Sequence, residues 1–93
     1  MSHSFLVHND GDHVGVAVRD IEAGEDVEGF VMETGGRVSV TSKGAIPLGH
    51  KIALVELADG ADVLKYQTKI GVTSQPILPG DYVHTHNIRS ARW

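Results

Sequence analysis

A short glycine-centred unit recurs four times along the chain and constrains its fold more than any other feature. Each copy has an aliphatic residue, two variable positions, Gly, two further variable positions and a second aliphatic residue. The copies span residues 21–27, 46–52, 57–63 and 77–83. The unit is too short and too irregularly spaced for a solenoid repeat, so it indicates a recurrent turn. Gly can adopt the positive φ of a tight turn, while the aliphatic residues anchor both arms in a core.

The remaining apolar stretches predict short strands. Residues 5–8 and 13–19 flank a turn-forming Asn-Asp-Gly-Asp run, which predicts a first hairpin. In the second of these strands Val14, Val16 and Val18 alternate, so they share one face. We expect that face to be buried.

A second hairpin is predicted from residues 30–32 and 37–41, which a Gly-Gly pair connects. In residues 62–70, a strand would set Val63, Lys65 and Gln67 on one face and Leu64, Tyr66 and Thr68 on the other. If this segment forms one strand, Lys65 and Tyr66 project from opposite faces and cannot line the same one.

The whole chain, residues 1–93, predicts a single small domain that is mostly β. A brief helix candidate at residues 54–57 is the exception, and no stretch keeps a helical period, so we expect little helix. A chain of 93 residues buries only a thin core, and 11 Gly with 5% aromatic residues suit many turns. No linker or low-complexity run marks a second domain.

Charge and composition disfavour several classes of partner. The 8 Lys and Arg against 12 Asp and Glu give a net charge of -4, which opposes binding to nucleic acid or anionic lipid. The absence of Cys removes disulfides, thiolate metal sites and cysteine nucleophiles. No apolar run reaches the length of a membrane span, and the first residues lack the order of a signal peptide. We therefore expect a cytoplasmic protein without a nucleic-acid or membrane partner.

The second copy of the glycine unit carries two adjacent basic residues, His50 and Lys51. At the position of His50 the other copies have Glu25, Ala61 and Asp81. Basic groups in an apolar turn lose hydration unless they meet an anion, so the pair indicates an oxyanion-binding site. The structural alternative is that His50 bonds a backbone carbonyl and Lys51 extends to water.

A second polar cluster lies at His84, His86 and Asn87. If residues 84–86 form a strand, the two imidazoles share a face about 6 to 7 Å apart and can converge on one metal ion. Nitrogen and oxygen donors without thiols suit iron, manganese or zinc. Two ligands do not close a site, and hydrogen-bonded surface histidines are the alternative. Asn87 could hold a substrate oxygen or form a turn.

These candidates do not make a self-contained active site. The sequence has no Ser-His-Asp order, phosphate loop or dinucleotide fingerprint. Arg89, Arg92 and Trp93 could clamp an anion or dock on a partner, or could form a solvated tail. A domain this thin leaves a reacting centre in water unless another chain covers it. We therefore expect a subunit of a larger enzyme.

Four groups of residues together carry a family resemblance. They are Val14-Gly15-Val16-Ala17-Val18 with Asp20-Ile21, Ile46 to Leu54, Val63-Leu64-Lys65-Tyr66 with Ile70-Gly71, and Gly80 with His84-Thr85-His86-Asn87. With them the chain resembles the small SAF (β-clip) domain of the altronate and galactarate dehydratase family, which also occurs as the free small subunit of sulfolactate sulfo-lyase. The length and the ending of the chain are most similar to that free subunit. Gln67 stands where the family has Gly, and Thr85 where it usually has Val.

The resemblance implies a β-clip fold and a lyase subunit that is active only with a large partner subunit. The implied reaction is β-elimination from a small anionic 2-hydroxy acid, with (2R)-sulfolactate giving pyruvate and sulfite. It also implies a divalent metal, iron or manganese ahead of zinc, shared with the large subunit. Three alternatives are the small subunit of an altronate-type sugar-acid dehydratase, a non-catalytic sugar-acid-binding module and a purely structural assembly domain.

The implied roles divide the candidate residues into three groups. His50 and Lys51 would act on the anionic substrate or in proton transfer. His84 and His86 would bind the metal or substrate oxygens. The substrate-binding group is Asn87, Lys65 and Tyr66.

Overall fold

The computed structural model describes residues 3–65 and 68–90, and this part of the chain contains nine strands and no helix. The strands are β1 (Phe5–Val7), β2 (Val14–Ala17), β3 (Asp26–Val31), β4 (Arg37–Thr41), β5 (Lys51–Ala53), β6 (Asp62–Lys65), β7 (Thr68–Thr73), β8 (Tyr82–Val83) and β9 (Ile88–Ser90). The expected β fold is confirmed, whereas the helix candidate at 54–57 is wrong. No helix in the described residues is long and apolar enough to cross a membrane.

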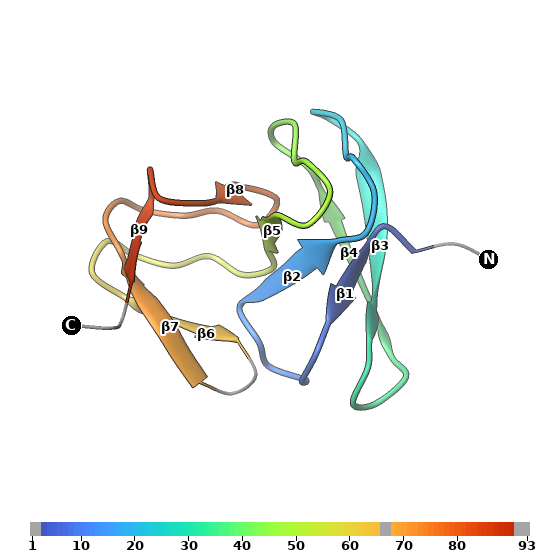
Figure 1. Cartoon of the computed structure of the whole chain (residues 1–93), viewed down its shortest axis with the longest axis horizontal. Coiled ribbons are helices and arrows are strands. Elements are labelled where there is room, and N and C mark those ends of the chain that lie inside the picture. The colour runs from blue at the N-terminus through green and yellow to red at the C-terminus, as the bar shows by residue number, and fades with distance from the viewer. Residues whose placement is uncertain (1–2, 66–67, 91–93) are drawn as a thin grey trace.

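The strands form two sheets (Figure 1). The larger sheet has the order β4-β3-β1-β2-β5-β8, and the smaller has the order β6-β7-β9. All neighbours are antiparallel except β1 and β3, which are parallel. In Figure 1, β5 lies between the N-terminal strands β1 to β4 and the smaller sheet. This small domain of curled sheets is consistent with a β-clip.

Both predicted hairpins are present, as β1–β2 and β3–β4. Residues 62–70 do not form the single strand that we considered, because they fold back as the hairpin β6–β7 with Lys65 opposite Thr68. No Gly, Pro, Asn or Asp stands between Lys65 and Thr68, so the sequence carried no turn signal for this reversal. That connection, Tyr66 and Gln67, lies outside the described residues.

The four glycine units are tight turns, as predicted, and they pair two by two. Backbone bridges join Ile21 with Ile46, and Leu57 with Ile77. The central Gly of each unit has a φ between 80° and 92°, and the next residue donates its N–H to the carbonyl three positions earlier. One pair of turns closes the base of the β3–β4 hairpin, and the other closes the base of β6–β7. The same arrangement of turn, hairpin and turn therefore occurs twice in the chain.

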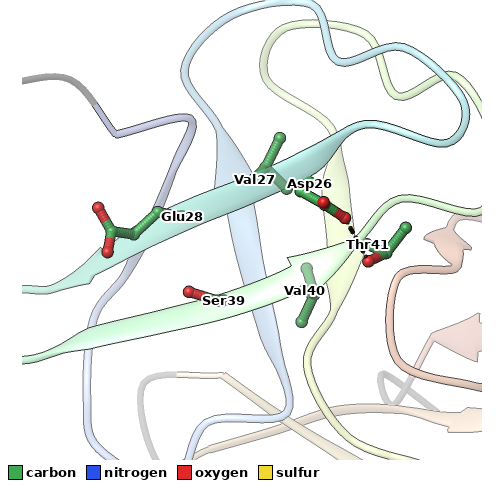
Figure 2. Close-up of a pocket in the computed structure, with 6 residues that line it drawn as sticks. All are labelled: Asp26, Val27, Glu28, Ser39, Val40 and Thr41. Atoms are coloured by element: carbon green, nitrogen blue, oxygen red, sulfur yellow. Dashed lines mark hydrogen bonds between the residues drawn. The ribbon is translucent and has the colours of Figure 1, made fainter.

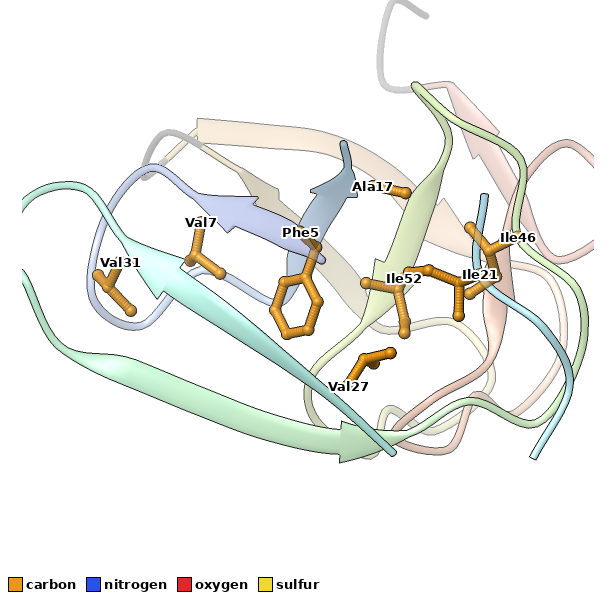
Figure 3. Close-up of a cluster of buried hydrophobic side chains, with 8 residues drawn as sticks. All are labelled: Phe5, Val7, Ala17, Ile21, Val27, Val31, Ile46 and Ile52. Atoms are coloured by element: carbon orange, nitrogen blue, oxygen red, sulfur yellow. The ribbon is translucent and has the colours of Figure 1, made fainter. Parts of the chain in front are cut away.

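Two clusters of buried apolar side chains hold the domain together. The first cluster, shown in Figure 3, consists of Phe5, Val7, Ala17, Ile21, Val27, Val31, Ile46 and Ile52. The second consists of Val14, Ala53, Val63, Ile77 and Val83. Aliphatic residues of the glycine units belong to both clusters, so the turns anchor the core as expected.

The predicted buried face of Val14, Val16 and Val18 is only partly correct. Val14 is buried, but Val18 lies beyond the end of β2 and is 38% exposed. Ala17 is buried instead, in the other cluster. Residues of opposite parity face opposite sides of a strand, so both faces of β2 are covered. The prediction assumed a strand with one solvated face.

Candidate functional site

The residue after Gly has a structural role in two of the four turns. In the first turn the Glu25 carboxylate accepts the N–H of Glu22 at 3.0 Å, and in the fourth the Asp81 carboxylate accepts the N–H of Leu78 at 2.7 Å. The residue that corresponds to Glu22 and Leu78 in the second turn is Pro47, which has no N–H to donate. The His50 side chain is therefore not needed to cap its own turn.

His50 instead contacts Tyr82, which the sequence reasoning did not select. The Nδ1 atom of His50 lies 2.7 Å from the Tyr82 hydroxyl. The antiparallel pairing of β5 and β8, with Ile52 opposite Tyr82, brings the two side chains together. A signal was present in the sequence, because Tyr82 occupies in the fourth glycine unit the place that Lys51 has in the second.

The Tyr82 ring also joins the second polar cluster to the first. The His84 ring is stacked on it with centroids 5.5 Å apart, and the His86 ring is tilted against it at 5.7 Å. The His50 and His84 rings are 5.3 Å apart. The two predicted clusters thus meet, and Tyr82 lies between them.

Residues 84–87 form a turn, so the prediction that His84 and His86 share one face of a strand is wrong. The Asn87 side chain holds this turn, since its Oδ1 accepts the N–H of His84 and its Nδ2 donates to the Tyr82 carbonyl. Asn87 is 2% exposed, whereas His84 and His86 are exposed. A buried amide whose two polar atoms are both used by the backbone positions the turn. Its assignment to substrate binding stays a prediction.

A cavity of about 520 Å³ lies beside this cluster, between the two sheets. Its basic walls are Lys51 on β5, Lys65 on β6 and His84 in the turn after β8. The apolar lining is Ile70, Val83 and Ile88, with Thr85 at the same site. Two lysines beside apolar walls make this cavity a candidate site for a small anion, because charges are less screened there than in open water.

The environment of Lys65 makes its positive charge less favourable. Burial, and secondarily the Lys51 ammonium, lower the pKa of Lys65 below its usual value, while Asp12 acts in the opposite direction. Lys65 is therefore a more costly place for a positive charge than an ordinary surface lysine. An anion in the cavity would offset that cost.

His50 and Lys51 do not reach the cavity together. Successive residues point to opposite sides of an extended chain, and His50 is not among the described residues that line the cavity. The link between them is His84, which lines the cavity and also contacts the His50 ring. The two predicted clusters therefore lie together, with His50 behind His84 and not beside Lys51 at the cavity.

The described residues do not form a metal centre by themselves. Among residues 3–65 and 68–90, no group of three or more His, Asp or Glu side chains is arranged to hold an ion. His84 and His86 supply two imidazoles beside one tyrosine ring, which is short of a closed coordination shell. A metal would need donors from elsewhere, and the ligand assignment stays a prediction.

The other predicted residues are outside this arrangement. Tyr66, Arg92 and Trp93 lie outside the described residues. Arg89 is exposed on β9. None of these positions adds a described group to the cavity.

Two other hollows lack its chemistry. Figure 2 shows Asp26, Val27, Glu28, Ser39, Val40 and Thr41 around a cavity of about 380 Å³ on β3 and β4. None of these six residues is basic, and the Thr41 hydroxyl donates to Asp26 at 2.6 Å. A smaller hollow of about 200 Å³ touches Tyr82, His86 and Asn87, and Lys43 and Asp81 there carry opposite charges. The cavity between the sheets is the stronger candidate for an anion.

The comparison with protein families agrees with this geometry. The altronate/galactarate dehydratase SAF domain matches residues 3–91. The chain belongs to this family. All of the described site residues lie inside the matched segment, so the SAF assignment covers both the glycine turns and the cavity between the sheets.

Individual relatives of this SAF chain fall into two groups. The (2R)-sulfolactate sulfo-lyase subunit alpha of Chromohalobacter salexigens is 43% identical over 94 residues, which cover 100% of both chains. The subunit of the same name from Paracoccus pantotrophus is 44% identical over 54 residues, 58% of this chain and 81% of that one. Altronate dehydratase of Bacillus subtilis is 36% identical over 87 residues, which are 94% of this chain but 16% of that enzyme.

Proposed function

We propose that this SAF chain is the small subunit of a two-subunit lyase that converts (2R)-sulfolactate to pyruvate and sulfite. The observation that carries the proposal is the cavity between the sheets, where Lys51, Lys65 and His84 present positive or polar groups to a small anion. The full-length similarity to a sulfo-lyase subunit alpha supports this substrate over others.

The proposed reaction is a β-elimination. A base takes the C2 proton, and the electron pair of the C2–H bond forms the C2=C3 double bond, while the C3–S bond breaks and sulfite leaves with the electron pair of the C3–S bond. The resulting enolpyruvate then tautomerises to pyruvate. Loss of the C2 proton moves negative charge onto the carboxylate oxygens, so the hard step is the stabilisation of an enediolate.

In this proposal, residues of this chain stabilise the negative charge that develops on the substrate. The ammonium groups of Lys51 and Lys65 hold the carboxylate and the sulfonate, and they gain interaction energy as charge develops on the oxygens. Asn87 acts through the turn that carries His84. A partner subunit covers the exposed histidines and excludes water, because a cavity on so thin a domain cannot do so alone.

A divalent metal is the second part of the proposal. His84 and His86 would contribute imidazole nitrogens to an ion of iron or manganese type, or zinc, and the large subunit would supply the remaining ligands. When bound, such an ion polarises the substrate carboxylate. Metal content of the purified pair, compared between wild type and His86→Ala, tests this part independently of turnover. Equal metal content in the two would remove His86 from the ligand set.

The decisive experiment is reconstitution with the large subunit. We expect sulfite release from sulfolactate by the pair and none by this chain alone. Lys51→Met should raise KM at least about tenfold, because it removes a charge from the anion site. Lys69→Met, which removes an exposed lysine paired with Asp62 at 3.3 Å outside the cavity, is the matched control.

Other outcomes select other functions. Turnover by the chain alone would contradict the divided site. Dehydration of altronate by the pair without sulfite release would favour the sugar-acid dehydratase, to which the 36% identity points. Binding of a sugar acid with no product under any partner or metal condition would indicate a non-catalytic module. Unchanged activity of the pair with His50→Ala and His86→Ala would indicate a purely structural domain.

A further inference from the structure

One side chain touches both polar clusters of the site. Tyr82 contacts His50 through its hydroxyl and both His84 and His86 through its ring. Its backbone carbonyl accepts the Asn87 side chain at 2.8 Å. These contacts suggest that Tyr82 has a role in the site, and none has been assigned to it above.

The hydroxyl contact bears on the proton of His50. A neutral imidazole carries its proton on one ring nitrogen and accepts with the other. A phenol donates more readily than it accepts, because its oxygen lone pair is delocalised into the ring. When Tyr82 donates to Nδ1 across 2.7 Å, the His50 proton must be on Nε2.

The second glycine unit makes this contact possible. The equivalent side chains in the first and fourth units are held by a backbone N–H of their own turn. Pro47 removes that donor in the second unit, and the pairing of β5 with β8 brings the Tyr82 hydroxyl to the freed ring. The local sequence and the sheet register therefore act together on one imidazole.

We propose that Tyr82 is a positioning residue that keeps the His50 proton on Nε2, so that His50 is a hydrogen-bond donor behind His84, which lines the cavity, and does not abstract a proton from the substrate. This rests on the proposed lyase function and decides between the two roles open to His50. An N–H dipole held close to the cavity favours the negative charge that develops there, so it stabilises the transition state more than the ground state. The general base is then a group other than His50.

The direct test is nitrogen-15 NMR of the full chain at one fixed pH, with the His50 signals assigned by their loss in His50→Gln. We expect Nε2 protonated and Nδ1 unprotonated in wild type, and a mixture of tautomers in Tyr82→Phe. Phe keeps the ring against His84 and His86 and removes only the hydroxyl. Thr34→Val, which removes a hydroxyl bonded to Gly36 N–H in the β3–β4 turn, should leave the His50 signals unchanged. A proton on Nδ1 in wild type would overturn the proposal.

Turnover by the reconstituted pair gives a second, separate readout. Tyr82→Phe should lower kcat roughly tenfold with little change in KM, the loss expected for one hydrogen bond that matters in the transition state. His50→Gln should retain much more activity than His50→Ala, because the Gln amide still donates whereas neither side chain can act as a base. Equal loss in the two would contradict a donor role. If the wild-type pair released no sulfite, the lyase proposal would fail while the NMR result still decided the tautomer.

Discussion

At the scale of single residues, the charge of Lys65 reduces the stability of the folded chain. Burial and the Lys51 ammonium lower the pKa of Lys65, so the folded chain holds this proton less tightly than the unfolded chain does. Between the folded pKa and the ordinary value of 10.5, the unfolded state binds more protons. The free energy of unfolding therefore rises with pH across that interval and is reduced below it.

Lys65→Met tests this linkage. The variant should lack the wild-type rise in the free energy of unfolding near the upper end of the pH scale, and it should be no less stable than wild type at neutral pH. Urea unfolding of both proteins across a pH series measures the difference, with other titrations cancelling between them. The same variant should bind anions more weakly. The linkage would be contradicted if the free energy of unfolding of wild type, relative to that of Lys65→Met, fell with pH between the folded pKa of Lys65 and 10.5.

At the scale of elements, the four glycine turns have the same backbone conformation but differ in the atoms that surround the glycine. A Cβ at Gly49 or Gly60 would meet no atom within 4 Å, whereas at Gly80 it would overlap the Thr41 carbonyl oxygen. All three glycines have a positive φ, which L-residues adopt at a cost. Backbone strain and steric clash can therefore be separated within one chain.

The corresponding prediction uses Ala at each turn. Gly49→Ala and Gly60→Ala should each lower the free energy of unfolding by about 1 to 2 kcal/mol through strain alone. Gly80→Ala should cost clearly more, because a backbone carbonyl cannot give way. Of the first two, only Gly49→Ala should lower turnover by the pair, since His50 follows it directly. Chemical denaturation measures the free energy of unfolding of the three variants. An equal loss of stability in all three would contradict the steric clash expected at Gly80.

At the scale of the whole molecule, the cavity belongs to neither sheet alone. Lys51 and Val83 come from the six-stranded sheet, while Lys65, Ile70 and Ile88 come from strands of the three-stranded sheet. A ligand that contacts both walls stabilises the packing of one sheet against the other. Binding should therefore be visible as stability of the entire chain.

Thermal unfolding with increasing sulfolactate tests that coupling. A ligand present at about a hundred times its Kd should add roughly 2.7 kcal/mol to the free energy of unfolding. Lys51→Met should show little or no shift at the same concentrations, and Lys69→Met should behave like wild type. An equal shift in Lys51→Met would place the ligand outside the cavity.

Much of the fold could be predicted because its signals are local. The Gly of each unit marks a positive φ wherever it occurs, and the flanking aliphatic residues point to a core. The hairpins β1–β2 and β3–β4 follow from turn residues between alternating stretches. The pairing of Lys65 with Thr68 and the two covered faces of β2 depend on tertiary packing, so local periodicity could not reveal them.

The sequence by itself determined the four turns, the two polar clusters and the presence of His50 where the other glycine units carry an acid or Ala, since these depend only on residue type and spacing. Tertiary structure alone decided which side chains meet. The register of β5 against β8 brings Tyr82 to His50, and the meeting of the two sheets brings Lys65 to the cavity of Lys51. Hydrogen bonds and charge interactions act over a few ångströms, so they are set by pairing between strands and not by order along the chain.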